Sequence, residues 1–288
     1  MKALPAALNL SDDDFFAPTP NPVLTSQLLE SAFVGVALRA PAQVDIGTRQ
    51  TLPLLVVSRF DGARDWALPF HDHAWLVGID LGSGRFGLAA AFGSPKRPAS
   101  VGRGAKPSAE ELRTHGAQLS PVDARSRLGV PWQPGCWSFS LVYHDWLSNP
   151  VVVRLARPQA GLAKPPDGDA CPPESVARVQ VDFGQKGSAD GASRVKGRVS
   201  VAAEAPGAER QMLPVSLLIV TRDRGAPQRH DWTIPVEYRP GERRLAGVID
   251  HPVPATDPPQ AGTVAYLVVA GQVHGPRPWG AAKKPVRP

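Results

Sequence analysis

The chain has 288 residues, among them 32 prolines and 27 glycines, with 42% hydrophobic residues, 20% charged residues and a formal net charge of +6. Proline and glycine together make up about a fifth of the chain, which is below the roughly 25–30% typical of low-complexity sequences. No apolar run approaches the ~18 residues of a membrane span. The composition therefore predicts a folded chain with many turns and excludes a transmembrane class.

Most of the positive charge falls in two segments. Residues 93–130 hold seven Lys or Arg against three acids, and residues 277–288 hold four Lys or Arg and no acid. Both segments lack apolar periodicity, and the first has no aromatic residues between its basic ones, as base stacking would require. We therefore interpret 93–130 as an inserted basic loop and 277–288 as a flexible basic tail. Specific nucleic-acid binding is not expected.

Residues 1–24 are predicted to form a flexible N-terminal segment. Its short apolar stretch is interrupted by Pro5, and three aspartates beginning at Asp12 follow where an export signal has small residues. We therefore expect a cytoplasmic protein in which Cys136 and Cys171 are free thiols. The alternative is an exported form in which these two cysteines make a single bridge.

Strand patterns follow along the rest of the chain. Apolar residues alternate as one buried face of a strand requires, or form short β-branched runs typical of strands buried on both faces. Only residues 26–33 and 108–118 are able to form a helical turn or two. The predicted strands are 34–38, 54–57, 75–80, 86–92, 137–143, 151–155, 195–201, 217–220, 244–249 and 263–270. The sequence therefore predicts an all-β protein.

The most regular pattern lies between residues 133 and 155. Four large side chains alternate from Trp137 to Tyr143, and alternation resumes at Val151 after a polar turn. A Pro-Gly-aromatic start, an alternating strand and a return strand together resemble the last two strands of immunoglobulin-like or fibronectin-like sandwiches. The resemblance covers the strand pattern alone and implies no function.

Short motifs recur in the same order in the two halves of the chain, which predicts an internal duplication. The matched segments are 40–41 with 205–206, 49–53 with 210–214, 54–59 with 217–222, and 65–69 with 231–235. We therefore expect two tandem immunoglobulin/fibronectin-like β-sandwich domains, at 25–158 and 174–276. A Pro/Gly linker at 159–173 joins them.

The only compact group of metal-ligating residue types is His71, Asp72 and His73. On a strand, His71 and His73 would share one face and hold one divalent ion, such as zinc, together with a third ligand. The candidates for that third ligand are His115, His144 and Asp80. The plainer interpretation of the histidine pair is a solvent-facing polar turn.

The dipeptide Asp-Trp occurs at 65–66, 145–146 and 231–232, and His precedes it in the last two cases. Neighbouring residues on a strand face opposite ways, so we do not expect a catalytic His–Asp pair. We interpret Trp66 and Trp232 as the starts of equivalent strands. Tryptophans at element ends are candidate binding residues, because an exposed indole can stack on a sugar or anchor a partner. These are Trp75, Trp132, Trp146 and Trp279.

No catalytic constellation is common to both predicted copies. We therefore expect a non-enzymatic accessory, scaffold or protein-binding module that has a protein partner and no cofactor. One alternative is a metal-dependent, hydrolase-like enzyme with its site at His71 and His73. The other is a carbohydrate-binding module that uses Trp75, Trp132 and Trp146.

Overall fold

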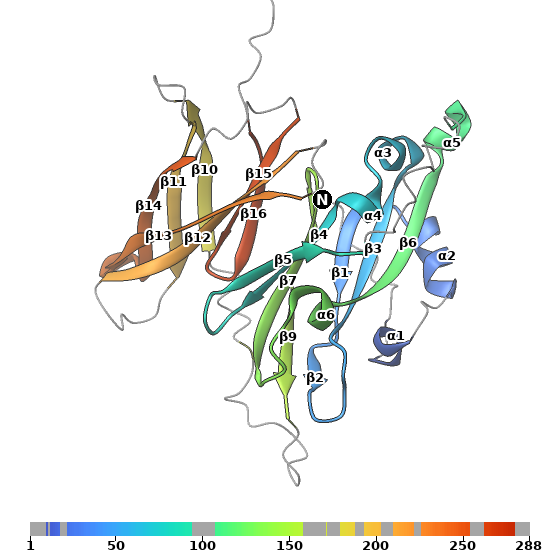
Figure 1. The fold of residues 1–288 in the computed structure, drawn as a ribbon, viewed down its shortest axis with the longest axis horizontal. Helices are drawn as coiled ribbons and strands as arrows, with labels where there is room; N and C mark the ends of the chain where they lie inside the picture. The colour runs from blue at the N-terminus through green and yellow to red at the C-terminus, as the bar shows by residue number, and fades with distance from the viewer. Residues whose placement is uncertain are drawn as a thin grey trace, which may run out of the picture. The chain divides into compact units, whose positions relative to one another are not determined.

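A computed structural model of the protein describes residues 10, 12–17, 22–93, 107–157, 171, 179–187, 193–202, 210–221, 226–253 and 262–279. The chain forms two compact units, residues 1–171 and 172–288, called unit 1 and unit 2 below. Strands dominate both units, which confirms the prediction of a mainly β protein (Figure 1). None of the helices in the described ranges has the length and apolar character needed to cross a bilayer.

Unit 1 is built from two sheets. One has the strand order β1-β3-β6, and the other has the order β2-β9-β7-β4-β5 with β8 paired to β7. The elements are α1 (Asp12–Phe16), α2 (Pro22–Glu30), β1 (Gly35–Arg39), β2 (Gln43–Asp45), β3 (Pro53–Asp61), α3 (Gly62–Ala67), α4 (Phe70–His73), β4 (Ala74–Asp80), β5 (Phe86–Ala90), α5 (Ala109–Arg113), β6 (His115–Asp123), α6 (Ala124–Leu128), β7 (Gly135–Tyr143), β8 (Trp146–Leu147) and β9 (Val151–Ala156).

The main core of unit 1 joins the facing sides of these two sheets. Val56 from β3 belongs to the same buried cluster as Phe139 and Tyr143 from β7. The predicted aromatic row of β7 therefore faces the core, and β9 pairs with β7 as the predicted return strand. The other side of β3 packs on α1 and α2, where Leu28 and Leu55 are buried together. Apolar surface on both faces thus fixes β3 at the centre of the unit.

Residues 107–130 are not a loop, although their polar composition suggested one. They form α5, β6 and α6, and β6 pairs with β3 from Asp61–His115 to Pro53–Asp123. The sequence pattern did not indicate this strand, because only its second half is buried, at Leu119, Ser120 and Val122. The N-terminal segment is likewise partly ordered, since Phe15 and Leu24 are buried on β3 and its neighbours. Residues 94–106 and the linker apart from Cys171 lie outside the described residues.

The two cysteines are joined by a disulfide, so the prediction of free thiols was wrong. Cys136 lies in β7 and Cys171 lies 35 residues further along the chain, with the two Cα atoms 5.6 Å apart. Alternation had placed Cys136 on the side of β7 away from the aromatic row, but it gave no information on which residue meets it there. The bridge fixes the end of unit 1 to one of its central strands.

Unit 2 is a single antiparallel sheet with the strand order β10-β11-β14-β13-β12-β15-β16. Its strands are β10 (Val179–Gly187), β11 (Ser193–Ala202), β12 (Arg210–Val220), β13 (Gln228–Arg239), β14 (Arg244–Val253), β15 (Val264–Val269) and β16 (Gln272–Pro278), with the short 3₁₀ helix η2 (Pro240–Glu242) between β13 and β14. The sheet curves around one core, so that its two ends approach each other: Arg277 Nη2 of β16 lies 3.9 Å from Asp182 Oδ1 of β10.

The strand pairings do not confirm the tandem duplication. The segment beginning at Leu54 lies in β3, between β1 and β6, whereas its match at Leu217 lies in β12, between β13 and β15. Trp66 lies in helix α3 and Trp232 in strand β13, so the matched Asp-Trp dipeptides do not begin equivalent strands. Asp61 accepts a hydrogen bond from the Arg64 N–H at 2.8 Å and so starts a helix where the second segment continues as a strand.

We predict that the disulfide supplies a large part of the stability of unit 1. In the chain-entropy model, closing a loop of this length lowers the entropy of the unfolded state by an amount equivalent to about 4 kcal/mol. Replacing both residues, Cys136→Ala and Cys171→Ala, should lower the free energy of unfolding by roughly 2–4 kcal/mol in urea titrations. Dithiothreitol should destabilise the natural sequence by a similar amount and leave the double variant unchanged. Equal stability with and without dithiothreitol would rule the bridge out.

We also predict that His274 makes unit 2 less stable in mild acid. Burial lowers the pKa of His274 from 6.5 to about 4, so the folded unit keeps it neutral while the unfolded chain binds a proton below 6.5. The free energy of unfolding of unit 2 therefore has its full value above pH 6.5. It decreases as the pH falls toward 4, by about 1–2 kcal/mol at pH 5. Amide hydrogen exchange in β15 and β16, corrected for intrinsic rates, should show this loss in the natural sequence and less of it in His274→Phe. His115→Phe in unit 1 is the control and should keep the full pH dependence.

Candidate functional site

The two histidines proposed as metal ligands lie in the short helix α4 and not on a strand. Residues two apart in a helix point about 200° apart around its axis, so His71 and His73 do not share a face in the way that was expected. His71 is exposed and its Nε2 lies 2.8 Å from Nε2 of Gln118, in β6. Within the described ranges, no three His, Cys, Asp or Glu residues are grouped closely enough to hold one ion.

The candidate third ligands are distributed over unit 1. Asp80 closes the turn after β4, where its Oδ1 accepts a hydrogen bond from the Gly82 N–H at 2.9 Å. His115 begins β6 and is exposed, whereas His144 is only 3% exposed in the turn between β7 and β8. The structure therefore brings none of the three into a shared set of ligands with His71.

His144 and Asp145 do contact each other, contrary to the argument that strand neighbours face opposite ways. His144 Nδ1 lies 3.1 Å from Asp145 Oδ1, because the pair sits in a turn where His144 has a φ of 49°. Arg64 of α3 makes an ion pair with the same carboxylate. Partial burial raises the pKa of Asp145, but the hydrogen bonds from Arg64 and His144 outweigh it and hold this pKa below its usual value. With His144 buried, we interpret this cluster as structural.

The candidate binding tryptophans do not form a common platform. The Arg64 guanidinium lies 3.8 Å from the ring centroid of Trp146, and the Arg125 guanidinium lies 4.3 Å from that of Trp132. One face of each indole is therefore covered by a cation. Trp75 is half-buried in β4, and Trp279 is 5% exposed within the core of unit 2. These placements favour packing roles for Trp132, Trp146 and Trp279.

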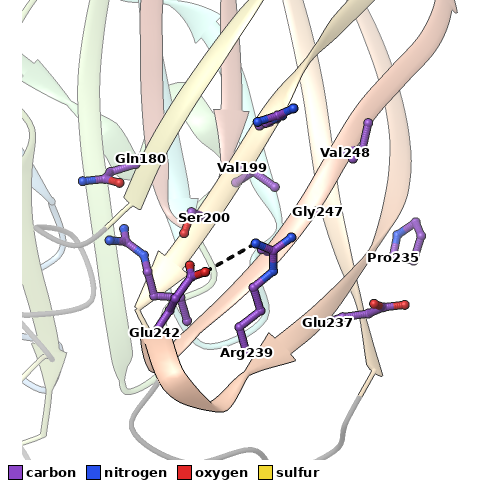
Figure 2. A pocket seen from close by; sticks show the side chains of 12 residues that line it. Gln180, Val199, Ser200, Pro235, Glu237, Arg239, Glu242, Gly247 and Val248 are labelled. Atoms are coloured by element: carbon purple, nitrogen blue, oxygen red, sulfur yellow. Dashed lines mark hydrogen bonds and ion pairs between the residues drawn. The ribbon is translucent and has the colours of Figure 1, made fainter.

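Unit 2 carries a groove on its outer face that is large enough for a ligand. It has a volume of about 650 Å³, which falls within the ~300–1,000 Å³ typical of ligand sites. Figure 2 shows its lining residues, which come from β10, β11, β13, β14 and η2. Arg198, Arg239 and Arg244 line the groove together with Glu237 and Glu242.

The groove lies where two neighbouring strands separate. β13 and β14 are paired only from Val236–Gly247 to Arg239–Arg244. Beyond Gly247, β14 continues to Val253 along β11, while residues 228–235 of β13 pair with β12. One edge of each strand therefore has no partner strand among the described residues, and Val248 beside the separation point is 67% exposed.

Ring stacking closes the inner side of this opening. Trp232 of β13 packs against the core of unit 2 and stacks on His251 of β14, with ring centroids 4.4 Å apart and planes 4° from parallel. Partial burial, with the nearby Arg194 as a smaller cause, lowers the pKa of His251 and favours its neutral form. The two strands thus separate at the surface without exposing the core beneath them.

Charges on the groove are only partly neutralised. Arg239 Nη1 lies 3.4 Å from Glu242 Oε1, and Figure 2 shows this ion pair at one end of the groove. Arg198 is exposed and has no side-chain hydrogen bond or ion pair with any described residue. A guanidinium presents five N–H donors in a planar fork that suits carboxylates. The groove is therefore able to receive anionic side chains.

Comparison with known proteins gives no family for this chain. No protein-family model matches it, and a search of curated proteins gave no significant match. Its functional interpretation therefore depends on the geometry of its own residues.

The close approach of β13 and β14 at the last pair of their ladder should depend on the absence of a side chain at Gly247. A Cβ at this position would lie 2.8 Å from the Pro235 carbonyl oxygen and 2.8 Å from Val236 Cγ1. We predict that Gly247→Ala forces the two strands apart and destabilises unit 2 by about 1–3 kcal/mol in chemical denaturation. Gly184→Ala, in β10, is the matched control because a Cβ there meets no atom within 4 Å. If both variants have the same stability as the natural sequence, the close approach at Gly247 is not required.

Proposed function

We propose that this protein acts by contact, as a non-enzymatic binding module that holds an extended, acidic segment of a partner protein. The observation that carries the proposal is the early end of the β13–β14 ladder at Val236–Gly247, beside a groove lined by arginines. This assigns the expected protein-binding role to one place in unit 2. It does not require the two units to be immunoglobulin-like copies of each other.

The strand edges favour an extended partner. A strand edge offers backbone N–H and C=O groups in the spacing that another strand needs, and strand addition is a common mode of peptide recognition. In unit 2, residues 248–253 of β14 and residues 228–235 of β13 have such edges on the sides that face each other. The exposed side chain of Val248 supplies an apolar contact at the same point.

The charged residues favour an acidic partner. Arg198 and Arg244 lie on β11 and β14, and Arg239 lies at the end of β13, so the three guanidinium groups belong to different strands around the groove. A segment that alternates apolar and acidic residues would place its acidic side chains on one face. Complementary charge of this kind contributes mainly to specificity and to the association rate.

The disulfide also bears on where such a partner is met. Bridges persist in oxidising compartments and are rare in the cytosol. The Cys136–Cys171 bond therefore supports the exported form over the cytoplasmic one. We infer that the protein acts outside the reducing cytosol. Fractionation of the native host, with the thiols alkylated before lysis, would test this location.

A peptide titration tests the proposed function. We predict that a fluorescent ten-residue peptide of alternating Val and Glu binds the full chain in an anisotropy assay, and that binding weakens as salt is added. The same peptide with alternate backbone nitrogens methylated should lose binding, because it cannot make a ladder. A peptide of alternating Val and Lys should not bind.

Matched variants locate the binding site. Arg198→Ala and Arg244→Ala should each weaken binding up to about fivefold, the effect of losing one charge contact that solvent partly screens. Arg277→Ala is the control, because Arg277 is an exposed arginine of β16 that lies outside the groove and outside both strand edges. Equal binding of the acidic and basic peptides, or no effect of either groove variant, would contradict the proposal.

A further inference from the structure

Unit 1 contains a second, chemically opposite cavity. It lies where the ends of β3 and β6 meet α3, α4 and α5, and it has a volume of about 380 Å³. Phe60 and Ala117 provide apolar walls, whereas Gln118 and His71 provide polar ones. This volume is sufficient for a small organic group.

Three carboxylates line this cavity, and no Lys or Arg among the described residues does. They are Asp61, Asp65 and Glu111, from β3, α3 and α5. One oxygen of each accepts a hydrogen bond from a nearby backbone N–H at 2.7–3.0 Å. The other oxygen of Asp61 and that of Asp65 accept no hydrogen bond from the residues that the structure describes, whereas the Glu111 carboxylate also interacts with the Ser108 side chain. The local charge is therefore strongly negative in a chain whose net charge is +6.

A serine side chain in the lining of the cavity is a second feature of the site. Ser58 is 3% exposed, lines the cavity, and lies opposite Gln118 in the β3–β6 ladder. Its hydroxyl group has no hydrogen-bond partner within the described part of the chain. Because Ser58 lines the cavity, this hydroxyl is available to a donor or acceptor supplied by a ligand.

The walls that carry the carboxylates are held together by a tight backbone contact. The Gly62 N–H donates a hydrogen bond to the Thr114 carbonyl oxygen at 3.0 Å. A Cβ on Gly62 would lie 2.5 Å from the Glu111 carbonyl oxygen, so α3 and α5 approach as closely as glycine allows. The carboxylates of Asp61 and Asp65 thus keep a fixed position relative to that of Glu111.

We propose that this cavity binds an alkylammonium group, carried either by a free amine or by a lysine side chain. An ammonium has three N–H donors and no acceptor, which matches a cavity that offers a hydroxyl, an amide oxygen and carboxylates. The alkyl stem packs on Phe60 and Ala117 in the way that lysine stems lie along apolar surfaces. A bare divalent ion fits less well, because no three ligating residues in the described ranges are close enough to share it. This site is independent of the groove in unit 2.

Ligand-observed NMR on the full chain tests the proposal. Saturation transfer should be observed to n-butylammonium and should be at least tenfold weaker to n-butanol, which has the same length and no charge. Nα-acetyl-lysine amide and its Nε-acetylated form provide the lysine arm of the test. Tighter binding of n-butylammonium would indicate a free amine as the natural ligand, and tighter binding of Nα-acetyl-lysine amide would indicate a lysine side chain. Equal binding of charged and neutral forms, or no binding of any amine at millimolar concentration, would overturn the proposal.

Two conservative variants localise the site without disturbing the fold. Ser58→Ala removes a hydroxyl that has no described partner, and Asp65→Asn keeps an oxygen for the Phe70 N–H. Each should weaken n-butylammonium binding at least fivefold. Ser120→Ala is the control, because Ser120 is a buried serine of β6 outside the cavity. Displacement of n-butylammonium by micromolar zinc would instead support a metal site at His71 and would overturn the assignment.

Discussion

The fold of unit 2 depends on one constraint, which is that strand β13 pairs with two different neighbouring strands along its length. Its first part pairs with β12 and its last four residues pair with β14, so the sheet bends around its core at Val236. Gly247 permits this bend, because a side chain there would meet the carbonyl of Pro235. The bend encloses Ile234 and Ile249 in the core, and the same bend separates two strand edges at the surface. Core formation and the proposed binding groove are thus consequences of one geometry.

The two cavities show that net charge is a poor guide to what a protein attracts. The groove of unit 2 combines three arginines with two glutamates, whereas the cavity of unit 1 combines three carboxylates with no Lys or Arg in its described lining. Dissolved salt screens the electrostatic field of each charged group beyond a distance of about 10 Å at an ionic strength of about 0.1 M. Opposite preferences are therefore able to coexist in one chain, each set by the strands that bring its residues together.

Alternation in the sequence was a reliable guide to the strands whose faces are uniformly buried. The row from Trp137 to Tyr143 and the run at residues 54–57 both form strands, because nearly every second side chain, or every side chain, enters a core. The pattern failed for β6, where only residues around Leu119 are covered, and for Trp66, where a cap at Asp61 starts a helix. It also failed for His144, whose contact with Asp145 depends on a turn and not on a strand.

The sequence by itself determined that the chain is mainly β, because burial of alternating side chains is a local property of each strand. It also placed the β7–β9 hairpin, since the two strands are joined by a short turn. Only the tertiary structure decided that Cys136 meets Cys171, that β13 separates from β14, and that Ser58 shares a cavity with three carboxylates. Each of these joins residues far apart in sequence or depends on which strands pair, and periodicity carries no information about such contacts.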